Sequence, residues 1–293
     1  MITMNKRPEL QDFSKIIHNP YEPDKYKACK PNYSSLGFAI YDVFRSFEEI
    51  SPDIGLKQYV IMPDHIHFIL QIFKELDMPL GKYLAIFKNR VINRAREKGI
   101  FCGSEGESVF EPGFNDQFLL ANRSLNGMYV YLQHNPYWRW MRWERPEFFR
   151  RIHDVELVGI KCSLYGNLSL LDNAFKSPVI AHRAEMADPD LMKRKMDFWE
   201  YTILNGGVVV GAFVNKVEKG IRDFAFERGG KVIWIRNVAY EERQKPSEGI
   251  LNECAKGNLL IVSPDLKGAL GSGRTFREEC LFMNDLAERM ALG

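Results

Sequence analysis

The chain has 293 residues, of which 45% are hydrophobic and 27% charged, and its formal net charge is +2. This composition is typical of a folded globular protein and excludes a disordered or collagen-like chain. The small net charge does not by itself indicate a nucleic-acid-binding protein. The length allows two domains of ordinary size.

The cysteines and the apolar segments predict the cellular compartment of the protein. Five cysteines are scattered along the chain without a CxxC pair, which favours reduced thiols over a disulfide framework or a zinc site. The N-terminal MITMNKRPEL lacks the apolar segment of a signal peptide. No apolar run approaches the roughly 20 residues that span a bilayer. We therefore expect a soluble, cytoplasmic protein without a membrane partner.

The first half of the chain alternates strand and helix signals. The expected elements, in chain order, are a short edge strand within 22–33, a helix over 35–50, strands over 57–62 and 65–72, a helix over 80–99, a strand ending the segment 109–120, and a helix over 122–136 that stops near Pro136. Because this order is strand–helix–strand–strand–helix–strand, the pattern predicts an α+β ferredoxin-like (split βαβ) fold.

The second half has a different pattern, in which short continuous apolar runs alternate with helices. The runs cover 178–183, 208–213, 231–236 and 259–264, and the helices cover 188–204, 217–228 and about 248–256. Buried strands alternating with helices predict an α/β Rossmann-like domain with a parallel sheet. We expect a first domain over 1–152 and a second over 153–293.

The role of the second domain stays open. Its strand–turn–helix segments faintly resemble Rossmann-like nucleotide- or DNA-processing domains, but the G-x-G-x-x-G spacing is missing after the strand. The stretch GALGSG (268–273) precedes a helix in which Thr275 and Glu278 are spaced as a capping box. It is either a plain glycine-rich loop or a cradle for a phosphate.

The stretch YVIMPDHIHFIL (59–70) places two histidines at the start of the strand over 65–72, within an otherwise apolar run. Residues i and i+2 of a strand share a face and lie roughly 6.5–7 Å apart along it, so His65 and His67 could converge on one cation. An isolated HxH pattern can equally be two polar residues on a solvated face. A metal site needs a further protein ligand from elsewhere in the fold.

Several motifs together resemble one known family. VIMPDHIHFIL resembles the HUH motif of the single-tyrosine transposases, including the REP-associated tyrosine transposases of insertion-sequence type. FKNRVINRAR (87–96) resembles the basic helix of that family, GFNDQFL (113–119) its glycine-aromatic strand entry, and YLQHNP (131–136) its tyrosine motif. The resemblance covers roughly residues 20–145, and its motifs keep the family's order.

The resemblance implies a metal-dependent transposase or endonuclease that nicks and rejoins single-stranded DNA at hairpin or palindromic sites. Tyr131 would be the nucleophile and would form a 5′-phosphotyrosine intermediate. His65, His67 and Asn135 would hold the divalent cation, and this donor set suits Mg²⁺ or Mn²⁺. A free tyrosine has a pKa near 10 and attacks poorly at neutral pH, so a cation on the phosphate would assist the displacement.

Tyr129 and Gln133 have the same i, i+4 spacing as Tyr131 and Asn135. Some relatives in the family use glutamine as the third ligand. The two tyrosines point roughly 200° apart on a helix, so both cannot serve one site. The match to the Asn-Pro motif favours Tyr131.

Two segments are candidates for DNA contact. In the helix over 80–99 we select Lys88, Arg90 and Arg94 as phosphate contacts. In YWRWMRWERPEFFRR (137–151) we select Trp138, Arg139 and Arg142, because tryptophans interleaved with arginines can stack bases of a single strand. The alternatives are a solvated charged face for the helix and domain packing for the tryptophans.

Two other functions compete with transposition. A domesticated DNA-binding or housekeeping protein would keep the scaffold without transposing. A metal-dependent hydrolase unrelated to DNA would use the histidines but would not require the spacing of Tyr131 and Asn135. Family members occur as homodimers with exchanged tyrosine helices or as monomers, so a homodimer is possible.

Overall fold

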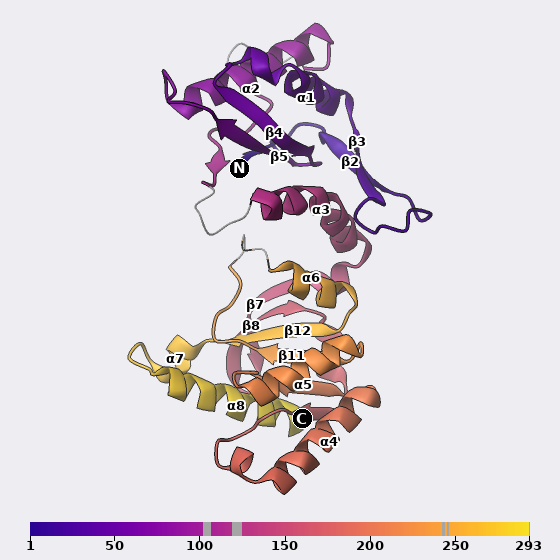
Figure 1. Ribbon diagram of the computed structural model, residues 1–293, viewed down its shortest axis with the longest axis vertical. Coiled ribbons are helices and arrows are strands. Elements are labelled where there is room, and N and C mark those ends of the chain that lie inside the picture. The colour runs from indigo at the N-terminus through magenta and orange to yellow at the C-terminus, as the bar shows by residue number, and fades with distance from the viewer. Residues whose placement is uncertain (102–106, 119–124, 242–243, 245, 293) are drawn as a thin grey trace. The chain divides into compact units, whose positions relative to one another are not determined.

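The computed structural model describes residues 1–101, 107–118, 125–241, 244 and 246–292. It divides the chain into two compact units, Met1–Trp140 and Met141–Gly293 (Figure 1). The division falls inside helix α3 (Leu125–Glu144), earlier than the boundary expected near residue 152. Among the described residues, no helix is both long and apolar enough to cross a membrane.

The first unit is built on a four-stranded antiparallel sheet. Its strand order is β4-β5-β1-β6, with β1 at Ile2–Asn5, β4 at Ile54–Ile61, β5 at His65–Ile72 and β6 at Asn115–Asp116. Helices α1 (Ser35–Arg45) and α2 (Leu80–Glu97) cover one face, and α3 covers the other (Figure 1). A 3₁₀ helix, Phe47–Glu49, follows α1.

The pleat of β5 assigns its side chains to two different environments. Ile66 and Phe68 are fully buried in the core beneath α1 and α2, where Phe68 packs 5.5 Å from the ring of Phe87. Since successive side chains alternate, the two histidines and Ile69 project from the opposite face toward α3. Each buried phenylalanine contributes about 1.5–3 kcal/mol, which fixes the register that orients the histidines.

The position of the first strand was predicted wrongly. It is the N-terminal segment Ile2–Asn5 that enters the four-stranded sheet, between β5 and β6. The strand within 22–33 is β3 (Cys29–Tyr33), which pairs with β2 (Ser14–His18) in a separate two-stranded sheet. The alternation of Ile2 and Met4 is too short for periodicity alone to identify a strand.

The expected stop at Pro136 was also wrong, because α3 continues through this proline to Glu144. A proline inside a helix removes one backbone hydrogen bond and costs about 3 kcal/mol. Tyr137, Trp138 and Met141 are buried in the turns that follow. Their burial offsets the loss and keeps the second half of the helix in place.

The second unit contains a six-stranded mixed sheet of order β7-β8-β12-β11-β10-β9. The strands are β7 Arg150–Leu157, β8 Ile160–Gly166, β9 Lys176–Pro178, β10 Val208–Gly211, β11 Lys231–Ile235 and β12 Leu259–Pro264. The four strands from β9 to β12 are parallel, as the sequence predicts. The antiparallel hairpin β7–β8 was not predicted, and the run expected over 178–183 is a strand only as far as Pro178.

Helices cover both faces of this sheet. They are α4 Pro189–Leu204, α5 Lys216–Glu227, α6 Glu248–Ala255, α7 Leu266–Leu270 and α8 Phe276–Leu292, with 3₁₀ helices at Pro146–Phe149, Leu168–Asp172 and Glu185–Ala187. Side chains of α8 pack against alternate residues of β10, β11 and β12, and α4, α5 and α6 contact the sheet from the other side. Asp188 is the N-cap of α4, since its side chain accepts from the backbone of Leu191.

The glycine-rich stretch 268–273 closes α7 and leads into α8. Thr275 and Glu278 form the expected capping box, in which the Thr275 N–H donates to Glu278 Oε2. A side chain added at Gly271 or Gly273 would meet no atom within 4 Å. Gly271 has a φ of +81°, a conformation that favours glycine, and a side chain at Gly268 would meet the Asp265 carboxylate that caps α7. Backbone geometry and capping account for these two glycines, as in a plain glycine-rich loop.

Candidate active site

His65 and His67 lie side by side on β5, on the face covered by α3. Their ring centres are 4.5 Å apart in an edge-to-face arrangement. The His67 side chain is 6% exposed, and His65 is half-buried. The expected shared face of the two imidazoles is therefore present, and its partly enclosed position differs from that of an open solvated strand face.

Each ring is fixed through its Nδ1 atom. His67 Nδ1 is hydrogen-bonded to Thr3 Oγ1 at 2.7 Å, and Thr3 is the residue directly opposite His67 in the β1–β5 register. His65 Nδ1 donates to Asp64 Oδ1, also at 2.7 Å. Bonds of this kind fix the ring orientation of metal-binding histidines and direct Nε2 toward the metal.

Asp64 links His65 to helix α3. Its second oxygen lies 3.3 Å from Arg139 Nη1, so one carboxylate bridges an imidazole and a guanidinium. The hydrogen bond from His65 holds the pKa of Asp64 well below its usual range, and Arg139 lowers this pKa further. The sequence did not lead us to this contact of Asp64, although its place directly before His65 was a signal. Arg139, which we selected from the sequence as a DNA contact, pairs with this aspartate instead.

Helix α3 brings the tyrosine motif to the same face. The ring centre of Tyr131 is 6.0 Å from that of His67. Asn135, one turn later, is 5% exposed, whereas Gln133 is exposed to solvent. Positions i and i+4 share a helix face, so this burial favours the pair Tyr131 and Asn135 over the alternative that uses Gln133.

Tyr129 packs in the same small apolar cluster as Tyr131, together with Leu132 of α3 and Ile69 of β5. Its backbone carbonyl accepts a hydrogen bond from Gln58 of β4 at 3.4 Å. These contacts give Tyr129 a packing role at the interface between helix and sheet.

The donor set fits a divalent cation. Nε2 of His65 is buried and has no hydrogen-bond partner among the described residues. No group of three His, Cys, Asp or Glu side chains suited to a metal occurs in the described part of the chain. A cation here would be held by the two imidazoles, with Asn135 as the third ligand that the motif resemblance implies, and this set would leave coordination positions for substrate oxygens.

An open cavity of about 430 Å³ lies beside His65. Its lining residues are Asn5, Lys6, Pro8, Asp12, Asp64, His65 and Glu111. Three carboxylates face a single lysine, and Lys6 is buried with its ammonium near Asp12. The carboxylates of this cavity have partners, since Asp64 binds His65 and Arg139, and Asn5 donates to Glu111.

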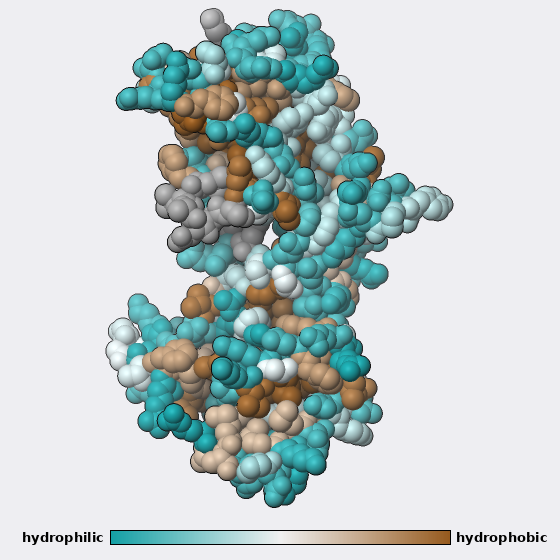
Figure 2. All heavy atoms as spheres, viewed as in Figure 1, coloured by the Kyte–Doolittle hydropathy of each residue, from teal (hydrophilic) through white to brown (hydrophobic). Residues whose placement is uncertain are grey.

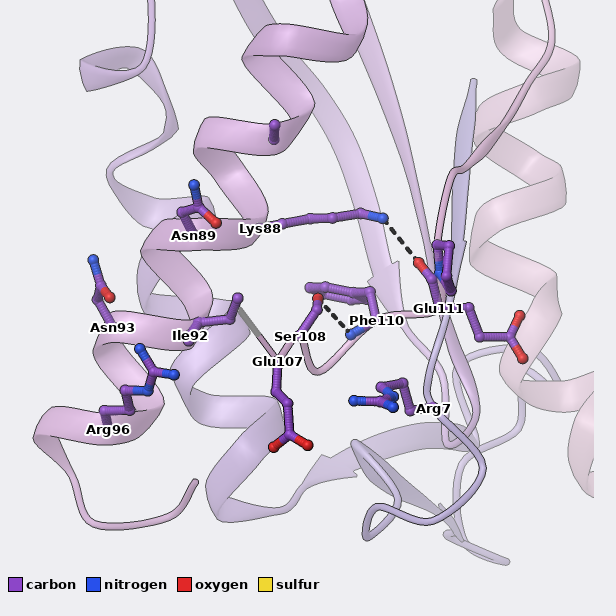
Figure 3. Close-up of a pocket in the computed structure, with 12 residues that line it drawn as sticks. Arg7, Lys88, Asn89, Ile92, Asn93, Arg96, Glu107, Ser108, Phe110 and Glu111 are labelled. Carbon is purple, nitrogen blue, oxygen red and sulfur yellow. Dashed lines mark hydrogen bonds between the residues drawn. The ribbon is translucent and has the colours of Figure 1, made fainter. Parts of the chain in front are cut away.

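A second cavity, of about 720 Å³, lies between α2 and residues 107–112 (Figure 3). Lys88 extends across it and donates to the carbonyl oxygens of Glu111 and Gly113 at 3.0 and 2.6 Å. Burial lowers the pKa of Lys88. The lysine selected as a phosphate contact is thus engaged in holding the 111–113 segment against α2.

Two other cations of α2 also have protein partners. Arg90 binds the carboxylate and the carbonyl oxygen of Glu49, each at 3.0 Å. Arg94 pairs with Glu97 one turn later and is largely exposed. Of the three residues selected on this helix, Arg94 is the one whose position suits a phosphate contact.

The aromatic segment is placed differently from the expectation. Trp138 is 5% exposed and packs 4.8 Å from the ring of Tyr137, so no base can stack on it in this conformation. Arg142 is half-buried and lies in the second unit, where its charge lowers the pKa of Tyr165 against the larger effect of burial. Trp143 is 74% exposed.

Comparisons with known proteins identified no relative of this chain. No family model matches the chain, and no curated protein or solved structure matches it either. Functional assignment therefore depends on the site geometry and on the motifs of the sequence.

Proposed function

We propose that the protein is a metal-dependent DNA transposase or endonuclease that nicks and rejoins single-stranded DNA in the cytoplasm. In this proposal Tyr131 is the nucleophile, and His65, His67 and Asn135 hold Mg²⁺ or Mn²⁺. The substrate would be hairpin-forming single-stranded DNA. The proposal extends the motif resemblance to HUH single-tyrosine transposases.

One observation carries the proposal: Tyr131 reaches the histidine pair from a different element. The tyrosine lies on α3 and the histidines lie on β5, yet the rings of Tyr131 and His67 are 6.0 Å apart. A hydrolase that used the two histidines alone would not require a tyrosine at this position. A nucleophile beside a cation is the arrangement that phosphoryl transfer needs.

The chemistry follows from these groups. The Tyr131 oxygen attacks the scissile phosphorus, the P–O3′ bond breaks, and the phenolic proton is transferred overall to the departing 3′ oxygen. The products are a 5′-phosphotyrosine and a free 3′ hydroxyl. A bound divalent cation would stabilise the charge that develops on the phosphate oxygens. Attack by a 3′ hydroxyl reverses the step and rejoins the strand.

The topology of the first unit is compatible with the proposal. We propose a ferredoxin-like nuclease domain on the basis of its antiparallel sheet of order β4-β5-β1-β6 with two helices on one face. For the second unit we propose a Rossmann-like domain, on the basis of its four parallel strands and flanking helices.

A covalent-adduct assay tests the function. The full chain is incubated with hairpin-bearing single-stranded DNA and Mn²⁺ or Mg²⁺, and the protein–DNA adduct is resolved by denaturing electrophoresis. We expect the wild type to form an adduct and Tyr131→Phe to form none, because phenylalanine has no attacking oxygen. A chelator should abolish the adduct in the wild type.

Tyr129→Phe is the matched control, since it removes a hydroxyl from the same helix. It should keep the adduct, and the double variant His65→Ala/His67→Ala should lose it. An adduct that persists in Tyr131→Phe would refute the assignment of the nucleophile. DNA binding without any adduct in the wild type would favour the alternative function, a domesticated DNA-binding or housekeeping protein on the same scaffold.

A further inference from the structure

We infer that the two-stranded sheet β2–β3, with the loop that joins its strands, is a DNA-binding arm that holds the phosphate backbone of a duplex stem. This arm (residues 14–33) is separate from the main sheet of the first unit. The inference rests on the proposed function, because it names where the paired part of a hairpin substrate binds. Four observations carry it.

The inner face of the arm is fixed to α3. The His18 ring stacks on Trp140 with centres 4.0 Å apart, and the Tyr26 ring stacks on His134 at 3.4 Å. Ile16 packs into the apolar cluster that contains Leu132. These contacts hold the arm on the helix that carries the proposed nucleophile.

The base of the arm is bonded to the turn that precedes the histidines. The Phe13 N–H donates to the carbonyl oxygen of Pro63 at 2.8 Å, and the Ser14 hydroxyl donates to the carbonyl oxygen of Ile61 at 2.9 Å. Pro63 is two residues before His65. The base of the arm therefore lies next to the candidate metal site, so DNA bound along the arm would end close to the two histidines.

The outer face of the arm carries positive charge without aromatic rings. Strand alternation places Lys15, Ile17, Lys30 and Asn32 on this face, and all four are exposed. Lys15 and Lys30 form no salt bridge and no side-chain hydrogen bond within the described part of the chain. Lysines suit the phosphate backbone of a duplex, whereas single strands are usually held by aromatic platforms. The paired strands present no ring on this face, and the exposed ring of the arm, Tyr21, lies in the loop that joins them.

The acidic residues of the arm are engaged within its own loop. The arm contains four lysines against Glu22 and Asp24. Asp24 accepts from the backbone of Tyr26 and Lys27, and Glu22 accepts from the backbone of Asp24. The projecting part of the arm is hydrophilic to neutral in colour (Figure 2). A two-stranded ribbon also has the width that the major groove admits.

Binding measured over a range of salt concentrations tests the arm. Fluorescence anisotropy is recorded for the full chain with a hairpin that carries a single-stranded tail, and separately with the unpaired tail alone. For Lys15→Ala/Lys30→Ala we expect affinity for the hairpin to fall on the order of tenfold. The slope of log K against log salt should become less steep, by the amount that corresponds to about two lost phosphate contacts. Affinity for the unpaired tail should stay close to that of the wild type.

The matched control is Lys193→Ala/Lys219→Ala, which removes two exposed lysines from the second unit. This control variant should leave the slope of log K against log salt for the hairpin unchanged. Lys15→Arg/Lys30→Arg keeps both charges and should bind the hairpin as the wild type does. An unchanged slope in the arm variant, or an equal loss in the control variant, would overturn the inference. So would an equal loss of affinity for the unpaired tail, or a wild type that does not bind the hairpin.

The adduct assay separates this inference from the proposed function. At saturating DNA the arm variant should still form the adduct through Tyr131, because no reacting group is changed. If the wild type forms no adduct while the arm variant loses hairpin affinity, the proposed chemistry is refuted and the DNA-binding role of the arm is supported. If the adduct forms and the arm variant binds the hairpin as tightly as the wild type, the DNA-binding role of the arm is refuted and the proposed chemistry is supported.

Discussion

At the scale of single residues, the decisive feature is how the two imidazoles are oriented. A threonine and an aspartate each bind an Nδ1 atom, and Arg139 adds a second bond to the aspartate. The aspartate is therefore a positioning residue for His65, and Arg139 acts through it. Orienting partners of this kind typically change metal affinity 10–100-fold when they are removed.

Substitution of Asp64 tests this role. In Asp64→Asn the bond to His65 loses its charge and the link to Arg139 weakens. We expect the affinity for Mn²⁺ to fall by roughly 10–100-fold in calorimetric titration. Asp12→Asn is the control, because Asp12 lines the same cavity but has no bond to a histidine. Equal Mn²⁺ affinities for the two variants would contradict the positioning role.

At the scale of elements, α3 combines packing and chemistry. Its Tyr131 lies beside His67 of β5, Asn135 is buried one turn later, and Trp138 is buried two turns beyond the tyrosine. The periodicity of 122–136 predicted a helix there, and residues 122–124 lie outside the described part of the chain. The passage through Pro136 could not be predicted, because local propensity does not include the burial of aromatic residues in later turns.

Two tryptophans of this helix give a matched comparison. Trp138 is 5% exposed and Trp143 is 74% exposed. Trp138→Ala should lower the free energy of unfolding by about 3–5 kcal/mol, because it removes a large buried side chain. Trp143→Ala should change it by less than about 0.5 kcal/mol. Urea denaturation measures both, and similar values for the two variants would show that Trp138 is not a core residue.

At the scale of the whole molecule, the residues proposed for chemistry all belong to the first unit. Strand spacing predicted the shared face of His65 and His67, and Tyr131 and Asn135 were selected through the resemblance of YLQHNP to a family motif. Thr3 was missed because its bond to His67 spans 64 positions and depends on strand register. The hairpin β7–β8 was also missed, although its two strands are adjacent in the chain. Its place beside β12 depends on pairing between β8 and a strand about 100 residues later.

The division into units predicts that the chemistry does not need the second unit. A fragment of residues 1–145, which keeps α3 intact, should fold cooperatively and form the covalent adduct with hairpin DNA. Its yield at saturating DNA should lie within about threefold of that of the full chain, because every group that contacts the reacting phosphate is retained. A folded fragment that forms no adduct would assign an essential role to residues beyond Arg145.

The identity of the attacking residue is the central claim, and peptide mapping tests it most directly. The adduct is digested with nuclease and trypsin, and the peptide that ends at Arg139 is fragmented in a mass spectrometer. We expect a nucleotide phosphate on Tyr131 and unmodified Tyr129 and Tyr137. A phosphate on either of these other tyrosines, or on a residue outside α3, would contradict it.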